Sequence, residues 1–352
     1  MSLRFTLPLF LCLAALTAVV NIVTEHYEPM GEELLANPDF RQGLSGWIGQ
    51  FDQAKATTTE GCLLIENSNP AKSMGLDQIL PVKQTEYPLL LQGAIRTENI
   101  KPGKLEWDQA RVLITGLDTS GKWLPGLRVA IQMNANTNWT RFSTIFHIPA
   151  GADTLLLRVE LNHATGKLFT KNLSLHMAQE SQWYAFAKWP ILCGWAFFLL
   201  VLARPYFLIP RRNLPLSLLV LGVGLLILAG AIVPGPDKEI LVRYLIVMIH
   251  DLGGFSAAHL PLDITKIGHF FGFLLLGLLS FLCFDQESPA KIFLDITLLA
   301  ATSECLQFFA VERTPLFNDV MIDSLGGLLG IVIAAIIIKL YFASTSIQAD
   351  VR

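Results

Sequence analysis

Charged side chains are scarce in this sequence, and their scarcity excludes several classes of protein. Asp, Glu, Lys and Arg make up 16% of the 352 residues, against about 25% in an average soluble domain. The formal net charge is only -3, and no run of Lys or Arg is present that could follow a phosphate backbone. Nucleic-acid binding is therefore not predicted. Apolar residues make up 52% of the chain, which favours an integral membrane protein.

Motifs of several enzyme classes are also missing. The segment "VPGPDKE" (Val233–Glu239) lacks the GxxxxGK(S/T) spacing of a phosphate-binding loop, and no Gly-x-Ser-x-Gly elbow of a serine hydrolase occurs. Of the five cysteines only Cys62 lies in the polar part of the chain, so no disulfide can form there. No CxxC pair indicates zinc, and no cofactor is predicted.

Long apolar runs are present instead, and they predict six membrane-spanning helices. The runs are Phe5–Val23, Trp189–Leu208, Leu214–Val233, Ile267–Phe284, Ile292–Ala310 and the stretch from Val320 to Tyr341. Asp295 and Glu304 interrupt the fifth, whereas Ile240–Ile249 is too short to span and is expected to be interfacial or re-entrant. The first run suits either a signal peptide or an anchor, and the lack of a small-x-small cleavage site favours an uncleaved anchor.

The positions of Lys and Arg predict the orientation in the membrane, because cytoplasmic loops are enriched in both. If both termini are cytoplasmic, six basic residues that flank the spans fall on the cytoplasmic side: Arg4, Arg204, Arg211, Arg212, Lys291 and Lys339. The long polar segment after the first span then lies outside the cytoplasm.

This polar segment, residues 24–182, predicts an antiparallel β-sandwich. Apolar and polar residues alternate over short runs separated by Gly, Pro and Asn turns. The runs are Arg111–Asp118, Arg128–Asn134, Ser143–Pro149 and Thr154–Leu161. Trp47 and Trp139 flank strands and are expected to fill the core of the sandwich. Tyr87, Trp107 and Trp123 stand in polar, loop-like contexts and are better candidates for stacking against a sugar.

The start of this segment, "ELLANPDFRQGLSGWIGQFD", resembles the opening strand of CenC-like carbohydrate-binding jelly rolls. An Asn-x-x-Phe-x-x-Gly-Leu-x-x-Trp run is frequent in those modules, and here it consists of Asn37, Phe40, Gly43, Leu44 and Trp47. The resemblance covers about 145 residues and implies a jelly-roll fold with a carbohydrate ligand.

The last three predicted spans carry polar residues that are costly inside a membrane and are therefore usually paired or functional. On the predicted topology they all approach the outer surface from three helices and form one cluster: Lys266, His269, Glu304, Gln307, Arg313, Asp319 and Asp323. The small-xxx-small pairs Gly268/Gly272 and Gly326/Gly330 predict close helix packing around them.

The same region resembles the VanZ-like membrane protein family. Four motifs carry the resemblance over about 65 residues: "KIGHFFGFLLLG", "SECLQFF", "ERTPLFND" and "DVMIDSLGGLLG". Family members often have Asn where this chain has Asp323. The resemblance implies a bacterial, multi-pass protein of the inner (cytoplasmic) membrane and a link to glycopeptide resistance, but no defined reaction.

Together these patterns divide the chain into an anchor (1–23), an extracytoplasmic sandwich like a carbohydrate-binding module (24–182), a second span with its cytoplasmic loop (183–212), a VanZ-like four-helix domain (213–345) and a cytoplasmic tail (346–352). The predicted partners are the lipid bilayer and an envelope polysaccharide or lipid-linked glycan. The sequence does not predict an oligomeric state.

Two main hypotheses for the cluster remain open. In the first it binds or processes an envelope glycan or lipid-linked precursor. Glu304 or Asp319 is then the acid or base, His269 shuttles a proton, and substrate is held by Lys266, Gln307, Arg313 and Asp323. In the second the protein senses glycan or acts as a scaffold, and the cluster is a structural ion-pair network. A divalent-metal site and a transporter are further alternatives, disfavoured by the two cations and by the position away from the midplane.

Overall fold

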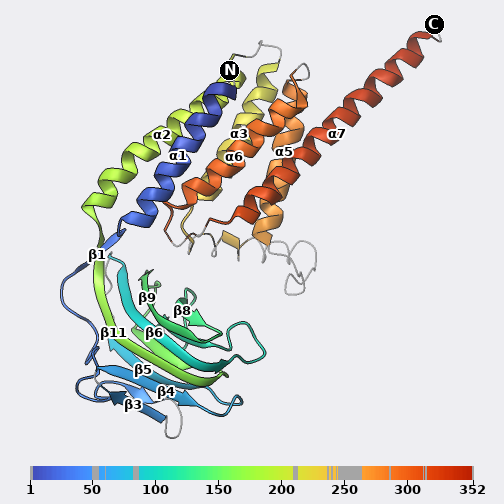
Figure 1. The fold of residues 1–352 in the computed structure, drawn as a ribbon. Coiled ribbons are helices and arrows are strands. Elements are labelled where there is room, and N and C mark those ends of the chain that lie inside the picture. The colour runs from blue at the N-terminus through green and yellow to red at the C-terminus, as the bar shows by residue number, and fades with distance from the viewer. Residues whose placement is uncertain are drawn as a thin grey trace. The chain divides into compact units, whose positions relative to one another are not determined.

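The computed structural model describes residues 3–49, 55–59, 61–81, 87–208, 213–235, 238, 241–242, 244, 264–284, 287–311, 313 and 315–350. Most of the predicted interfacial segment Ile240–Ile249 lies outside these residues, as do Arg211 and Arg212. The chain divides into two compact units (Figure 1). One is formed by Glu25–Ser181, and the other by Met1–Thr24 together with Gln182–Arg352.

The unit formed by Glu25–Ser181 is a sandwich of two antiparallel sheets, which confirms the predicted fold class. The six-stranded sheet has the order β3 (Lys55–Thr59), β4 (Cys62–Asn67), β11 (Thr165–Glu180), β6 (Leu89–Lys101) and β9 (Thr137–Phe146), with β1 (Tyr27–Met30) also paired to β11. The five-stranded sheet has the order β2 (Ile48–Gly49), β5 (Met74–Pro81), β10 (Thr154–Leu161), β7 (Ala110–Leu117) and β8 (Arg128–Met133).

The alternation in the sequence explains how these strands share one core. In β10 the residues Leu155, Leu157 and Val159 belong to the apolar core, whereas Arg158 and Glu160 have their side chains on the opposite face. Apolar residues from both sheets fill the space between them. The opposite face of the five-stranded sheet carries these charged groups together with Leu113 and Leu156.

The prediction for the two core tryptophans is right for one and wrong for the other. Trp47 is buried in the sandwich core, 5.2 Å from the ring centroid of Phe40. Trp139 is only half-buried and lies outside that core, and Nζ of Lys171 is 4.2 Å from its ring centroid. The pairing of β6 with β9 contains a register shift between Ile95 and Thr97. Trp139 is three residues from the core residue Phe142, so the alternation of side chains along β9 places its ring on the face opposite the core.

The second unit is helical, and its helices follow the predicted apolar runs closely. They are α1 (Leu3–Val23), α2 (Gln182–Phe207), α3 (Leu214–Ile232), α5 (Ile264–Cys283), α6 (Pro289–Gln307) and α7 (Phe317–Asp350). Five of them are long and apolar enough to cross a membrane, namely all but α6. Because Lys291, Asp295 and Glu304 lie within α6, its role as a sixth span stays a prediction.

Helices α5 and α7 approach so closely that their backbones touch. A Cβ atom added at Gly326 or Gly330 of α7 would strike a backbone carbonyl of α5, and one at Gly277 would strike a backbone carbonyl of α7. The prediction for the α7 glycines therefore holds, but that for α5 is wrong. Gly268 faces open space and Gly272 faces α3, so Gly277 makes the close contact instead.

Candidate functional site

The beginning of α5, the end of α6 and the beginning of α7 lie at the same end of the helical unit (Figure 1). This arrangement brings together the polar residues that the sequence singled out. We refer to them as the helix-end cluster: Lys266, His269, Glu304, Gln307, Arg313, Asp319 and Asp323.

Two ion pairs join α5 to α7 within this cluster. Nδ1 of His269 lies 3.4 Å from Oδ2 of Asp323, whose side chain has an exposed fraction of 0%. Nζ of Lys266 lies 3.7 Å from Oδ1 of Asp319, and this pair is more exposed. His269 follows Lys266 by three residues and Asp323 follows Asp319 by four, so the pairs form successive turns of two facing helices.

Both carboxylate oxygens of Glu304 accept hydrogen bonds from neighbouring groups. Its Oε1 accepts a hydrogen bond of 2.9 Å from Nε2 of Gln307, and its Oε2 accepts one of 2.8 Å from the backbone N–H of Leu316. Since Leu316 directly precedes α7, the carboxylate ties the end of α6 to the start of α7. The same carboxylate is close enough to Asp319, Asp323 and His269 for electrostatic interaction, so all belong to one cluster.

Other oxygens of the cluster lack such partners. Oδ1 of Asp319 and Oδ1 of Asp323 are buried and have no hydrogen-bond partner among the described residues, although Nζ of Lys266 lies 3.7 Å from Oδ1 of Asp319. Buried acceptors usually have one, and leaving one unpaired costs free energy. The Oγ atom of Ser324 is in the same state. These acceptors distinguish Asp319 and Asp323 from Glu304.

Arg313 supplies a cation next to these acceptors. It lies between α6 and α7, and it forms no ion pair with a carboxylate of the described residues. Partial burial lowers the pKa of its guanidinium, an effect that the nearby charges of Glu304 and Asp319 oppose. In the part of the chain that the structure describes, no group of three or more His, Cys, Asp and Glu residues could hold a metal ion.

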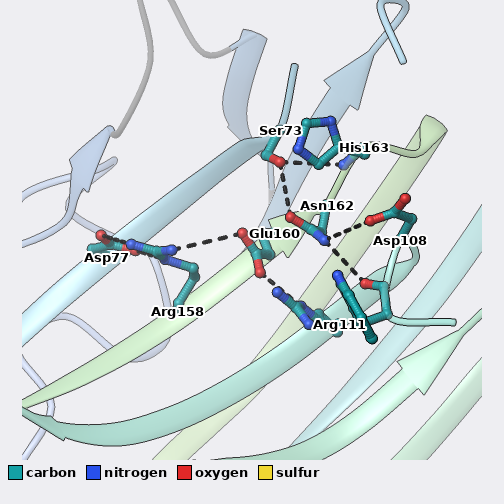
Figure 2. A network of polar contacts seen from close by, with 9 residues as sticks. Ser73, Asp77, Asp108, Arg111, Arg158, Glu160, Asn162 and His163 are labelled. Carbon is teal, nitrogen blue, oxygen red and sulfur yellow. Dashed lines mark hydrogen bonds and ion pairs between the residues drawn. The ribbon is translucent and has the colours of Figure 1, made fainter. Parts of the chain in front are cut away.

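The sandwich carries a second polar group, on the face of the five-stranded sheet that points away from the core (Figure 2). We refer to it as the sheet-face network: Ser73, Asp77, Asp108, Arg111, Arg158, Glu160, Asn162 and His163. Its charged centre crosses three strands. Nε of Arg158 lies 2.7 Å from Oδ1 of Asp77, and Nε of Arg111 lies 2.7 Å from Oε1 of Glu160.

The charges of the sheet-face network are largely buried. Side-chain exposure is 12% for Arg158 and 3% for Glu160. The distance between Nη1 of Arg158 and Oε2 of Glu160 is 3.9 Å. Burial alone would lower the pKa of Arg158, but the hydrogen bond to Asp77 and the charges of Asp77 and Glu160 together raise it. Buried charges persist when they are paired in this way.

Two of the three tryptophan and tyrosine residues predicted to bind sugar lie beside this network. The guanidinium of Arg158 is 5.2 Å from the ring centroid of Trp123. Nδ2 of Asn162 donates to the carbonyl of Trp107 at 3.1 Å, and the Trp107 side chain is half-exposed. Tyr87 is also half-exposed and precedes β6, a strand of the six-stranded sheet.

The helical unit has a match among protein families. Residues 231–338 match the VanZ/LLP1 family model. The matched residues include all seven residues of the helix-end cluster. No curated protein matches the chain significantly.

The sandwich is similar to solved carbohydrate-binding modules. TmCBM61 in complex with β-1,4-galactotriose matches with a TM-score of 0.30 and 13% identity, over 42% of this chain and 99% of that one. The CBM22-1 xylan-binding domain from Paenibacillus barcinonensis Xyn10C matches with a TM-score of 0.30 and 13% identity, over 44% and 99%. The chain spans only 21% of the bacteriophage CBA120 tailspike protein 4 domain, which matches with a TM-score of 0.34 and 11% identity over 41% of this chain.

Sequence reasoning missed the charged centre of the sheet-face network. A signal for it was present, because the alternation in "TLLLRVEL" places Arg158 and Glu160 on the face opposite Leu155, Leu157 and Val159. Their partners Asp77 and Arg111 come from strands far away in the sequence, and strand order decides that pairing.

Proposed function

We propose that this membrane protein acts in the cell envelope and that its helix-end cluster binds or processes an envelope glycan or a lipid-linked precursor. The observation that carries the proposal is that Asp319 and Asp323 each have a buried oxygen without a hydrogen-bond partner among the described residues. Sugar hydroxyl groups donate hydrogen bonds to such acceptors.

The cations of the cluster suit the charged part of a lipid-linked precursor. Arg313 has no paired carboxylate among the described residues, and Lys266 is held only loosely by Asp319 at 3.7 Å. A guanidinium and an ammonium at this position can bind a phosphate. The proposed ligand therefore combines hydroxyl donors with at least one anionic group. Should the site be catalytic, Asp319 is the carboxylate best placed to exchange a proton, because Glu304 is bonded on both oxygens.

The proposed orientation places this cluster on the outer side of a bacterial inner membrane. Both termini are then cytoplasmic, residues 24–182 lie outside the cytoplasm, and the chain divides at the predicted boundaries. This placement rests on the distribution of Lys and Arg. The half-exposed rings of Trp107 and Trp123 beside the sheet-face network would serve as the second, glycan-binding surface of the same protein.

The test uses a strain that lacks the protein, complemented with the wild type or with Asp319→Asn or Asp323→Asn. Glycopeptide susceptibility and the amount of protein in the membrane are scored together. The proposal predicts that both variants accumulate normally and that Asp319→Asn loses the phenotype, since Asn keeps the shape but not the charge. Asp323→Asn introduces the residue often found in similar proteins and should keep the phenotype. Full activity of both variants would contradict it. Glu287→Gln, which neutralises an exposed carboxylate at the start of α6, is the control.

A structural role for the cluster is the second candidate, and the bonds of Glu304 favour it. Those bonds hold the end of α6 to the start of α7, and the pair of His269 and Asp323 holds α5 to α7. If the cluster is only structural, the Asp319 and Asp323 variants lose membrane abundance and phenotype in parallel. The two candidate functions thus predict different amounts of the variant proteins in the membrane.

A further inference from the structure

A pocket of about 370 Å³ lies between α1, α2 and α6, and the function proposed above does not use it. Its volume falls in the range of roughly 300–1,000 Å³ typical of small-molecule sites. The lining is mostly apolar and includes Thr6, Val201, Pro205, Ala290, Lys291 and Asp295.

This pocket is separate from the helix-end cluster. Asp295 and Glu304 are nine residues apart on α6, which corresponds to roughly 14 Å along the helix axis. The residues that line the pocket lie at the opposite end of α6, near the start of α1 and the end of α2.

The polar groups of the pocket are mainly hydrogen-bond acceptors. Asp295 is half-buried and makes no hydrogen bond or ion pair with the described residues. Pro205 has no backbone N–H, so the carbonyl of Val201 lacks its usual donor four residues later in α2. A ligand that donates several hydrogen bonds would satisfy both groups.

The only basic side chain in the lining is weakly engaged. Nζ of Lys291 lies 3.1 Å from Oε2 of Glu287, and both side chains are more than a third exposed. Such surface pairs contribute little free energy, so an anionic group can compete for Lys291. The pocket therefore offers one site for a cation, at Asp295, and a neighbouring site for an anion, at Lys291.

We propose that this pocket binds the headgroup of an aminophospholipid, with its primary ammonium at Asp295 and its phosphate at Lys291. An ammonium supplies three N–H donors, which match the carboxylate of Asp295 and the carbonyl of Val201. The apolar walls of the pocket accept the first part of an acyl chain. A quaternary ammonium has no N–H donors, so a choline headgroup is a poorer fit, and a glycerol headgroup has no positive charge to pair with Asp295.

The experiment uses the full-length protein reconstituted in nanodiscs that contain phosphatidylethanolamine, phosphatidylcholine and phosphatidylglycerol in equal amounts. Native mass spectrometry then counts the lipids retained by the released protein. The wild type is expected to retain phosphatidylethanolamine roughly tenfold more than phosphatidylcholine, as a charge-assisted hydrogen bond implies. Asp295→Asn should abolish this preference, whereas Glu287→Gln, outside the pocket lining, should keep it.

A second variant covers the case in which Asp295→Asn does not fold. Ala290 is exposed at the rim of the pocket, so Ala290→Trp fills the site without disturbing the core and should remove the preference as well. Equal retention of the three lipids by the wild type, a preference for phosphatidylglycerol, or an unchanged preference in both variants would each overturn the proposal.

Discussion

Nδ1 of His269 lies 3.4 Å from Oδ2 of Asp323, across the interface where α5 and α7 touch backbone to backbone. The other oxygen of Asp323 is buried without a partner among the described residues. One carboxylate thus holds two helices together and also presents an unused acceptor. This combination makes Asp323 the residue at which structural and ligand-binding roles have to be separated.

The pair predicts how substitutions of His269 affect stability. His269→Leu leaves the buried carboxylate of Asp323 unpaired and should destabilise the protein by about 3–5 kcal/mol. His269→Gln keeps a donor for Asp323 and should cost clearly less. Thermal unfolding of the purified protein measures both. Similar losses for the two variants would mean that the pair contributes little beyond packing.

Glu304 should behave as a loop anchor rather than as a freely available carboxylate. Glu304→Gln keeps an acceptor for the backbone N–H of Leu316, whereas Glu304→Leu leaves that N–H and the amide of Gln307 unpaired. Each unpaired buried group costs about 1–3 kcal/mol. We expect the unfolding temperature to fall in the order wild type, Gln variant, Leu variant. A Leu variant as stable as the wild type would show that the anchor is dispensable.

The close approach of α5 and α7 makes one glycine much less replaceable than another on the same pair of helices. Gly330→Ala forces its Cβ against the carbonyl of Leu274 and should destabilise by about 1–3 kcal/mol or more. Gly268→Ala meets nothing within 4 Å and should gain up to about 1 kcal/mol of helix propensity. Equal behaviour of the two variants in thermal unfolding would contradict this packing.

Most of the fold follows from residue pattern, whereas pairing and register do not. Strand β10 has the predicted bounds, Thr154–Leu161, because its alternation is regular. The prediction for Trp139 is wrong because a position flanking a strand does not say which face of the sheet the ring occupies. The prediction for Gly268 is wrong because the spacing of small residues does not say which helix lies opposite. The cluster residues were predictable from their cost in a membrane, but only the structure distinguishes the bonded Glu304 from Asp319 and Asp323.

The sheet-face network predicts a large stability difference between two arginines of the sandwich. Arg158→Met removes the guanidinium that pairs with Asp77, whose side-chain exposure is 6%, and should cost about 3–5 kcal/mol. Arg41→Met removes an exposed pair with Asp39 and should change stability by less than about 1 kcal/mol. Chemical unfolding monitored by tryptophan fluorescence measures both variants. A small change in the free energy of unfolding of Arg158→Met would indicate that water or another side chain replaces the guanidinium at Asp77.

The exposed tryptophans next to this network provide the test of glycan binding. Trp107→Ala removes a ring that is 54% exposed, so folding should be unchanged while retention of the full-length protein on envelope polysaccharide falls about tenfold. Trp123→Ala should lower retention too, because its ring lies over Arg158. Tyr87 is similarly exposed, at 50%, but it precedes β6 of the six-stranded sheet, so Tyr87→Ala should retain binding. If only Tyr87→Ala lost binding, the glycan would contact a different surface of the sandwich, and the network would be a structural element of the five-stranded sheet.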